Sequence, residues 1–307
     1  MSEHGHSHSC HHHHGADATG RALAIGIVLN MGFVLVEIGF GLASNSLSLL
    51  ADAGHNFSDV IGLLVAWGAI LLARRLPTPR FTFGWQSATI LAALANAMLL
   101  LIAVGGIAWE AMRRLSRPAA VDEMTIIWVA AVGVIINLGT ALMLMKGHKH
   151  DLNLRGAFLH MLADAAISVG VVLAGFGMMA TGWRWLDPAI SLVIAVVILV
   201  GTWGLFRQSL RLSLHGVPEN IDPNQVKTYL ISLPEVAEVH DLHIWGMSTT
   251  DTALTAHLVV CDTHPGNAFL VKLTEDLDRQ FGINHATLQI ELAGSDAPCK
   301  FAPDDVV

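Results

Sequence analysis

Charged side chains are scarce in this chain of 307 residues. Aspartate, glutamate, lysine and arginine together make up 14% of it, whereas soluble proteins carry about 25%. Hydrophobic residues supply 53% of the sequence. So little charge cannot cover a water-exposed surface of this size. The composition therefore excludes a wholly soluble protein and predicts an integral membrane protein in contact with the lipid bilayer.

Sequence signatures of several other classes are missing. The three cysteines, Cys10, Cys261 and Cys299, are far apart and form no CxxC pair, which argues against a disulfide framework. No GxxxxGK[ST] phosphate loop is present, which argues against a nucleotide-driven pump. No HExxH motif is present, which argues against a metalloprotease.

The few charges are unevenly distributed. From residue 208 onward, five basic residues stand against fourteen acidic ones, a net charge of −9, while the first 207 residues carry a net charge of +1. An acidic segment repels nucleic acid and anionic lipid, so we expect no nucleic-acid partner. Cations are compatible ligands for such a segment.

The hydrophobic residues form six long runs. Residues 1–20 precede them; this segment is rich in histidine and predicts a disordered tail with weak metal affinity. Each run is close to the ~20 residues that cross a bilayer, so we expect a transmembrane domain over residues 21–207. The expected helices lie at about 22–43, 47–73, 87–112, 124–145, 155–180 and 187–207.

Lysine and arginine in the short loops indicate the orientation of this domain. If the N-terminus is cytoplasmic, nine basic residues lie on the inner side and four on the outer side. This distribution predicts cytoplasmic N- and C-termini, although a cluster at Arg113, Arg114 and Arg117 opposes it.

Ionisable side chains interrupt two of the apolar runs. His55 and Asp59 are four residues apart, as are His160 and Asp164, so each pair projects from one face of a helix. A charged group at the centre of a membrane costs about 2.5–3.5 kcal/mol. One such pair alone would also fit a local salt link or a helix contact. Two identical pairs favour a tetrahedral site of two nitrogens and two oxygens, which suits Zn²⁺.

Residues 208–293 are typical of a small α+β domain, and residues 294–307 are expected to form a flexible tail. The order is helix, strand, strand, helix, strand. The expected elements are a helix that starts at Asp222, strands at about 236–246 and 252–261, a helix that ends at Gly282, and a strand at about 286–292.

Four stretches together resemble the cation diffusion facilitator family of metal transporters, especially its zinc-type bacterial members. They are SLSLLADAGHNFSD, HMLADA, VHDLHIW and ATLQIE, and the resemblance spans about residues 20–293. It implies a six-helix all-α transmembrane domain. It also implies a cytoplasmic α-β-β-α-β domain, of the metallochaperone or ferredoxin-like type, that pairs two protomers in a homodimer.

The resemblance implies that the transport site falls on His55, Asp59, His160 and Asp164. Histidine at the first of these positions, His55, makes the chain similar to the zinc-type members of the family. Imidazole nitrogen suits Zn²⁺, whereas an all-oxygen site suits Mn²⁺. Co²⁺ and Cd²⁺ are further expected substrates of such a site.

The family's regulatory metal positions fall best on His240, His257 and Glu291, with His243 and His285 nearby. On a regular strand, residues 240 and 243 point to opposite faces, so both serve one site only if the strand is locally distorted. Histidines at a domain surface are also commonly just solvated.

Three further residues are accessory candidates. Asp52 lies one turn from His55, where it could receive metal, accept a proton or orient a neighbour. His148 and His150 lie in the loop before the fifth span. They could collect cytoplasmic Zn²⁺, or they could belong to an ordinary solvated basic loop.

The sequence therefore predicts a secondary active transporter, and not an enzyme, in the bacterial cytoplasmic (inner) membrane. We expect it to export Zn²⁺ in exchange for protons by alternating access, for metal homeostasis and resistance, with Zn²⁺ also a regulatory ligand. Two alternatives stay open. One is a membrane-anchored metal sensor, and the other is an intramembrane metalloenzyme, which needs an open zinc coordination position.

Overall fold

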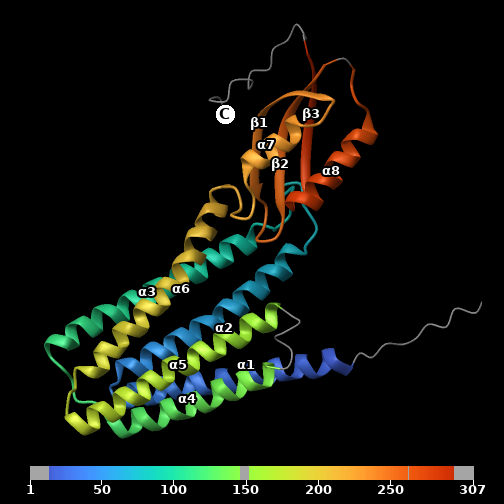
Figure 1. Cartoon of the computed structure of the whole chain (residues 1–307). Helices are drawn as coiled ribbons and strands as arrows, with labels where there is room; N and C mark the ends of the chain where they lie inside the picture. Colours follow the sequence, from blue (N-terminus) through green and yellow to red (C-terminus); the bar gives the residue numbers. More distant parts are fainter. Residues whose placement is uncertain (1–13, 146–151, 262, 294–307) are drawn as a thin grey trace, which may run out of the picture. The chain divides into compact units, whose positions relative to one another are not determined.

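The computed structural model describes residues 14–145, 152–261 and 263–293 (Figure 1). The contacts between residues divide the chain into two compact units, each made of two segments. The first unit combines the chain up to Ile61 with Leu100–Val200, and the second combines Gly62–Leu99 with the chain from Gly201. The expected all-α membrane part followed by a small α+β domain is confirmed.

Six long helices make up the membrane part. Five of them, α2 to α6, are long and apolar enough to cross a membrane, and α1 contributes the apolar stretch Val28–Ala43. The bounds differ from the expected ones mainly at the ends, where α1 begins earlier and α6 extends further. The helices are α1 (His14–Ala43), α2 (Leu47–Ala73), α3 (Ala88–Ser116), α4 (Glu123–Leu144), α5 (Leu152–Thr181) and α6 (Leu186–Ser213).

In the first unit, α4 packs along α5 and against α1. Their contacts belong to one apolar core, which includes Leu49, Ile126, Val171 and Met178. Burying side chains of this size in close contact stabilises the bundle through dispersion and fixes how the helices lie against one another.

A buried carboxylate fixes the start of α2. Asp187, in the first turn of α6, accepts hydrogen bonds from the Oγ of Ser46 at 2.7 Å and the Oγ of Ser48 at 2.6 Å. It also accepts from the backbone N–H groups of Leu47 at 2.9 Å and Ser48 at 3.1 Å. The first N–H groups of a helix have no partner within it, so Asp187 acts as a cap from another helix. The position of α2 is thereby set about two turns before His55.

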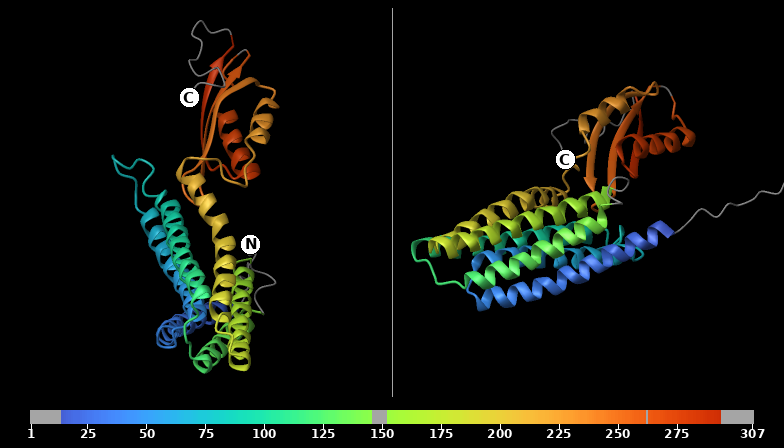
Figure 2. Two further views of the ribbon diagram at one scale, coloured as in Figure 1. Left: turned by 90° about the vertical axis from the view of Figure 1, so that its left-hand side faces the viewer. Right: turned by 60° about the horizontal axis from the view of Figure 1, so that its bottom comes forward.

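The small domain lies in the second unit and follows the expected element order. Strand β2 lies in the middle of the sheet, antiparallel to β1 and parallel to β3. Helices α7 and α8 cover one face of this sheet (Figure 2). The elements are α7 (Pro223–Ile231), β1 (Val236–Gly246), β2 (Thr252–Val260), α8 (Asn267–Phe281) and β3 (His285–Leu292).

Alternation along the strands separates the two faces of the sheet. Leu254, Ala256 and Leu258 of β2 join Leu230 of α7 and Leu277 of α8 in a closed apolar core. Because side chains alternate along a strand, the residues between them point to the other face. That second face carries His257 of β2 and, opposite it on β1, His240.

Candidate metal centres

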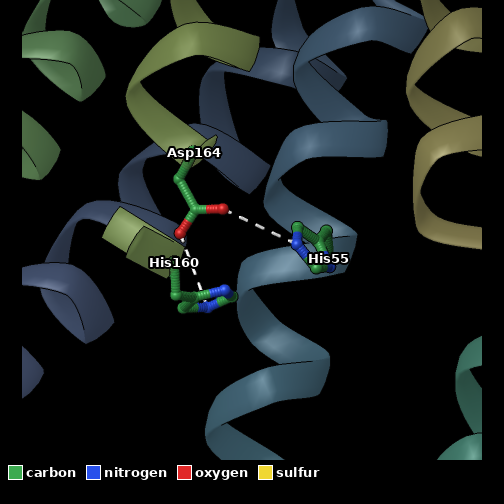
Figure 3. A group of neighbouring side chains, drawn as sticks. All are labelled: His55, His160 and Asp164. Carbon is green, nitrogen blue, oxygen red and sulfur yellow. Dashed lines mark ion pairs between the residues drawn. The ribbon is translucent and has the colours of Figure 1, made fainter. Parts of the chain in front are cut away.

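The first candidate centre lies between α2 and α5 (Figure 3). The carboxylate of Asp164 reaches both imidazoles: its oxygens lie 3.6 Å from the Nε2 of His55 and 3.6 Å from the Nε2 of His160. Asp59 reaches the same two nitrogens, at 3.1 Å from His160 and 3.7 Å from His55. The structure therefore brings together all four residues that the sequence assigns to the transport site.

These separations match tetrahedral metal coordination. With metal–ligand bonds of about 2.0–2.2 Å, two donors of a tetrahedral site are about 3.3–3.6 Å apart. The four nitrogen–oxygen distances of 3.1 to 3.7 Å lie around this range. His55, His160 and Asp164 also present donor atoms that all lie within 4.8 Å of one another. Small side-chain adjustments would close the four donors on one ion.

Burial differs among the four ligands. The side chain of Asp164 is 1% exposed and that of His55 is 15% exposed, whereas Asp59 is 30% and His160 is 42% exposed. Both oxygens of Asp164, the Oδ2 of Asp59 and the Nδ1 of His55 are buried without a hydrogen-bond partner among the described residues. Buried polar atoms normally have a partner, so these donors are suited to a bound cation.

The second candidate centre lies on the open face of the small sheet. His240 of β1 and His257 of β2 are directly opposite each other across the strand pair. Glu291 of β3 reaches both, with Oε2 at 3.2 Å from the Nε2 of His240 and Oε1 at 2.7 Å from the Nδ1 of His257. The three residues offer donor atoms within 4.8 Å of one another and could hold a metal ion.

A β-bulge at Asp241 reshapes the strand beside this centre. The pairing of β1 with β2 shifts register between His240 and His243, and Asp241 has a positive φ of 50°. His243 pairs with Thr255, which lies on the same face as His257, so the distortion places His240 and His243 on one face. A regular strand would have separated them.

Asp241 links two histidines, a role that the sequence analysis did not identify. Its Oδ1 lies 2.8 Å from the Nε2 of His243, and its Oδ2 lies 3.4 Å from the Nε2 of His257. The signal was present in the HDLH tetrapeptide, because an aspartate next to a ligating histidine is a common orienting partner. His243 therefore contacts the centre through Asp241.

The remaining candidates lie elsewhere. His285 begins β3 and makes an edge contact with the ring of Phe83, at 5.7 Å between centroids, away from Glu291 on the same strand. Asp52 is fully buried and accepts a hydrogen bond from Ser168. His148 and His150 fall outside the described residues.

Comparison with known families accounts for nearly all of the chain. Residues 23–212 match the family described as the cation efflux transmembrane domain. Residues 218–293 match the cation efflux protein cytoplasmic domain. The boundary between the two matches falls just after the end of α6.

Individual relatives match over almost their whole length. The chain is 38% identical over 284 residues to the cation efflux system protein CzcD of Alcaligenes sp. (strain CT14), covering 92% of this chain and 88% of the relative. It is 36% identical to the zinc transporter ZitB of Escherichia coli (strain K12), covering 88% and 87%. It is 34% identical to the cadmium, cobalt and zinc/H(+)-K(+) antiporter of Bacillus subtilis (strain 168), covering 88% of each.

Proposed function

This chain belongs to the cation efflux family of membrane transporters, and we propose that it exports Zn²⁺ from the cytoplasm in exchange for protons. The observation that carries the proposal is the cluster of His55, Asp59, His160 and Asp164, with nitrogen–oxygen distances of 3.1 to 3.7 Å. Membership makes it a metal cation transporter and not an enzyme. The choice of metal and the exchange with protons are the parts we propose.

The donor set supports Zn²⁺. Two imidazole nitrogens and two carboxylate oxygens give a borderline-soft site, which suits Zn²⁺ better than Mn²⁺ or Mg²⁺. Two carboxylates balance the charge of one divalent ion, so the loaded site is neutral at bilayer depth. Co²⁺ and Cd²⁺ fit the same donors, and the names of two relatives, ZitB and the Bacillus antiporter, include zinc.

The same donors couple metal to protons. A histidine must lose its proton before it binds metal, so metal and H⁺ compete for His55 and His160. An unperturbed imidazole titrates near pH 6.5, so a neutral cytoplasm favours metal loading, and a more acidic outer side favours release. Rocking of helices about a site near the midplane would expose it to each side in turn.

The proposal also includes the orientation of the protein and the membrane in which it lies. The distribution of lysine and arginine supports cytoplasmic N- and C-termini. The bacterial relatives support a location in a bacterial inner membrane. The opposing cluster is partly paired, since Arg114 and Arg113 both contact Glu110, at 3.0 and 3.3 Å, and Arg114 also donates to the backbone oxygen of Asn45 at 2.6 Å. Even with this cluster counted in full, nine basic residues on the inner side outnumber four on the outer side.

We propose that the cytoplasmic domain pairs two copies of the chain and binds regulatory Zn²⁺. The match to the cytoplasmic domain of cation efflux proteins supports the dimer. His240, His257 and Glu291 offer a ready set of ligands on the open face of the sheet. The net charge of −9 from residue 208 onward makes two such domains repel, and a bound cation would offset that repulsion.

Metal flux in proteoliposomes tests the function. Purified protein is reconstituted with a zinc dye inside the vesicles, and a pH gradient is imposed in either direction. Zn²⁺ should move against the direction of proton movement and should move faster than Mn²⁺. Zn²⁺ flux that ignores the pH gradient would contradict proton exchange, and absence of flux with intact Zn²⁺ binding would favour a membrane-anchored sensor.

A further inference from the structure

A second buried polar group lies in the first unit, and it contains no histidine. Glu37 of α1 and Asp52 of α2 are both 0% exposed. The carboxylate of Glu37 faces the carboxylate of Asp52 and the amide of Asn56. Asp52 accepts a hydrogen bond from the Oγ of Ser168 at 3.0 Å. Two carboxylates thus share one small buried space.

Several polar atoms in this space have no hydrogen-bond partner among the residues that the structure describes. They are both oxygens of Glu37, the Oδ1 of Asp52 and both polar atoms of the Asn56 amide. Asn56 is only 1% exposed, and its side chain is directed at Glu37. Leaving a buried polar atom unbonded costs about 1–3 kcal/mol, so the arrangement favours a ligand that bonds to oxygen.

No lysine or arginine in the surrounding stretches of sequence neutralises the two carboxylates. The sequence has no lysine or arginine within 22–73, 118–145 or 156–183, and its only histidines there are His55 and His160. Helix α4, which packs against α1, has no titratable residue between 124 and 145. The titratable groups that face the pair are Asp164 of α5 and, from the side of Asp52, His55.

We propose that Glu37 and Asp52 form a proton-binding site of the transporter, separate from its metal ligands. Two adjacent carboxylates at bilayer depth cannot both stay ionised without a cation beside them. One H⁺ held between their oxygens lowers the charge of the pair from −2 to −1 and supplies a hydrogen bond to an oxygen that otherwise has none. Ser168, which donates its hydrogen bond to Asp52, is a positioning residue that holds this carboxylate in place.

The site is coupled to the metal through Asp164, and this step rests on the proposed function. A Zn²⁺ ion at the membrane cluster balances the charges of Asp59 and Asp164. Without the metal, the carboxylates of Asp59 and Asp164 are uncompensated, and nearby negative charge favours a proton over an empty pair of carboxylates. Metal loading therefore releases a proton from a carboxyl oxygen of the pair to water, and metal release lets a proton return.

The test counts protons released per Zn²⁺ bound by the full-length protein, by calorimetry in two buffers of different ionisation enthalpy. Glu37→Gln should bind Zn²⁺ but release fewer protons, by as much as one per metal. Glu37→Asp, which keeps the carboxylate, should restore the count. Glu110→Gln is the matched control, because Glu110 pairs with arginines near the end of α3, and it should match the wild type. A wild-type proton count in zinc-binding Glu37→Gln would overturn the proposal.

Infrared spectroscopy of the wild-type protein gives a second readout that does not need the glutamine variant to fold. The metal-free protein should show the carbonyl stretch of a protonated carboxylic acid, shifted in Glu37→Asp and weakened by Zn²⁺. Absence of that band from the metal-free wild type would overturn the proton site. Loss of the band on adding potassium at constant pH would also overturn it, because the two carboxylates would then bind a metal ion in place of the proton. A wild-type protein that binds no Zn²⁺ would refute the proposed function, while the metal-free spectrum would still decide the proton site.

Discussion

The two candidate metal centres use the same chemistry on different supports. In the membrane part, Asp164 lies between the imidazoles of His55 and His160; in the small domain, Glu291 lies between those of His240 and His257. The membrane ligands are divided between two helices, α2 and α5. The cytoplasmic ligands are on neighbouring strands of one sheet.

This difference in support indicates a difference in role. Two helices satisfy their backbone hydrogen bonds internally, so α2 and α5 can separate without breaking any of them. Strands β1 and β2 share backbone hydrogen bonds beside His240 and His257, so separating these ligands would break the sheet. A centre that opens suits cargo that must be released. A centre with fixed geometry suits a regulatory ion.

The largest expected effect comes from removing the central carboxylate of each centre in turn. Asp164→Asn should lower Zn²⁺ flux by about 100-fold or more, because even residues behind a metal ligand are worth 10–100-fold. Glu291→Gln should lower it by less than about tenfold, since its ion is not the cargo. Stopped-flow uptake into proteoliposomes measures both. Equal losses in the two variants would erase the distinction between the centres.

Selectivity should follow the membrane centre alone. His55→Asp replaces a nitrogen ligand with oxygen, so the preference for Zn²⁺ over Mn²⁺ should fall by about tenfold or more. His257→Asp makes the same exchange in the sheet and should leave the transport preference unchanged. Competition between the two metals during uptake measures the ratio. An unchanged ratio in His55→Asp would show that this residue does not set selectivity.

Zn²⁺ binding at His240, His257 and Glu291 should make the small domain more stable against unfolding. The domain over residues 208–293 has a closed core of its own, so it can be studied alone. Zn²⁺ at 100 times its dissociation constant should raise its free energy of unfolding by about 2.7 kcal/mol. The double substitution His240→Ala and His257→Ala should remove most of that gain, whereas His285→Ala should keep it. Calorimetry that detects no Zn²⁺ binding to the wild-type domain would contradict the regulatory centre.

The smallest expected effect is on the pH dependence of the small domain's stability, through Asp251 in the turn that joins β1 to β2. Hydrogen bonds from Ser248, Asn284 and Thr250 hold the pKa of Asp251 below its usual value. An aspartate in an unfolded chain titrates near pH 3.9. The folded pKa is lower, so this stabilisation is present above about pH 4 and is lost as the pH falls through the folded pKa.

Thermal melts of the isolated domain between neutral and acidic pH measure this contribution. Asp251→Asn should melt lower than the wild type at neutral pH, and the gap should narrow as the pH falls. A gap that stays constant with pH would mean that the charge of Asp251 does not help to hold the two strands in register.

Local sequence patterns predict much of the fold. Apolar runs of membrane length predicted the helices to within a few residues at most ends, and the element order of the small domain is confirmed. The i,i+4 spacing of His55 with Asp59 and of His160 with Asp164 predicted which side chains share a helix face. Local spacing cannot say that α2 and α5 are neighbours, which depends on packing between distant segments.

The residues that escaped prediction act through tertiary contacts. Asp187 caps a helix that begins 140 residues earlier in the chain, and no local motif predicts a capping residue so distant in sequence. Asp241 joins its centre only because a bulge with a positive φ turns the strand there. Glu37 is a single acidic residue in an apolar run, and its pairing with Asp52 appears only when α1 and α2 are brought together.

Anomalous X-ray scattering from zinc-loaded crystals of the full-length protein would locate both ions. We expect a zinc peak bounded by His55, Asp59, His160 and Asp164 and a second peak beside His240, His257 and Glu291. In Asp164→Asn the first peak should vanish while the second persists. A wild-type protein with zinc beside His240, His257 and Glu291 and none at the four membrane residues would contradict the assignment of the transport site.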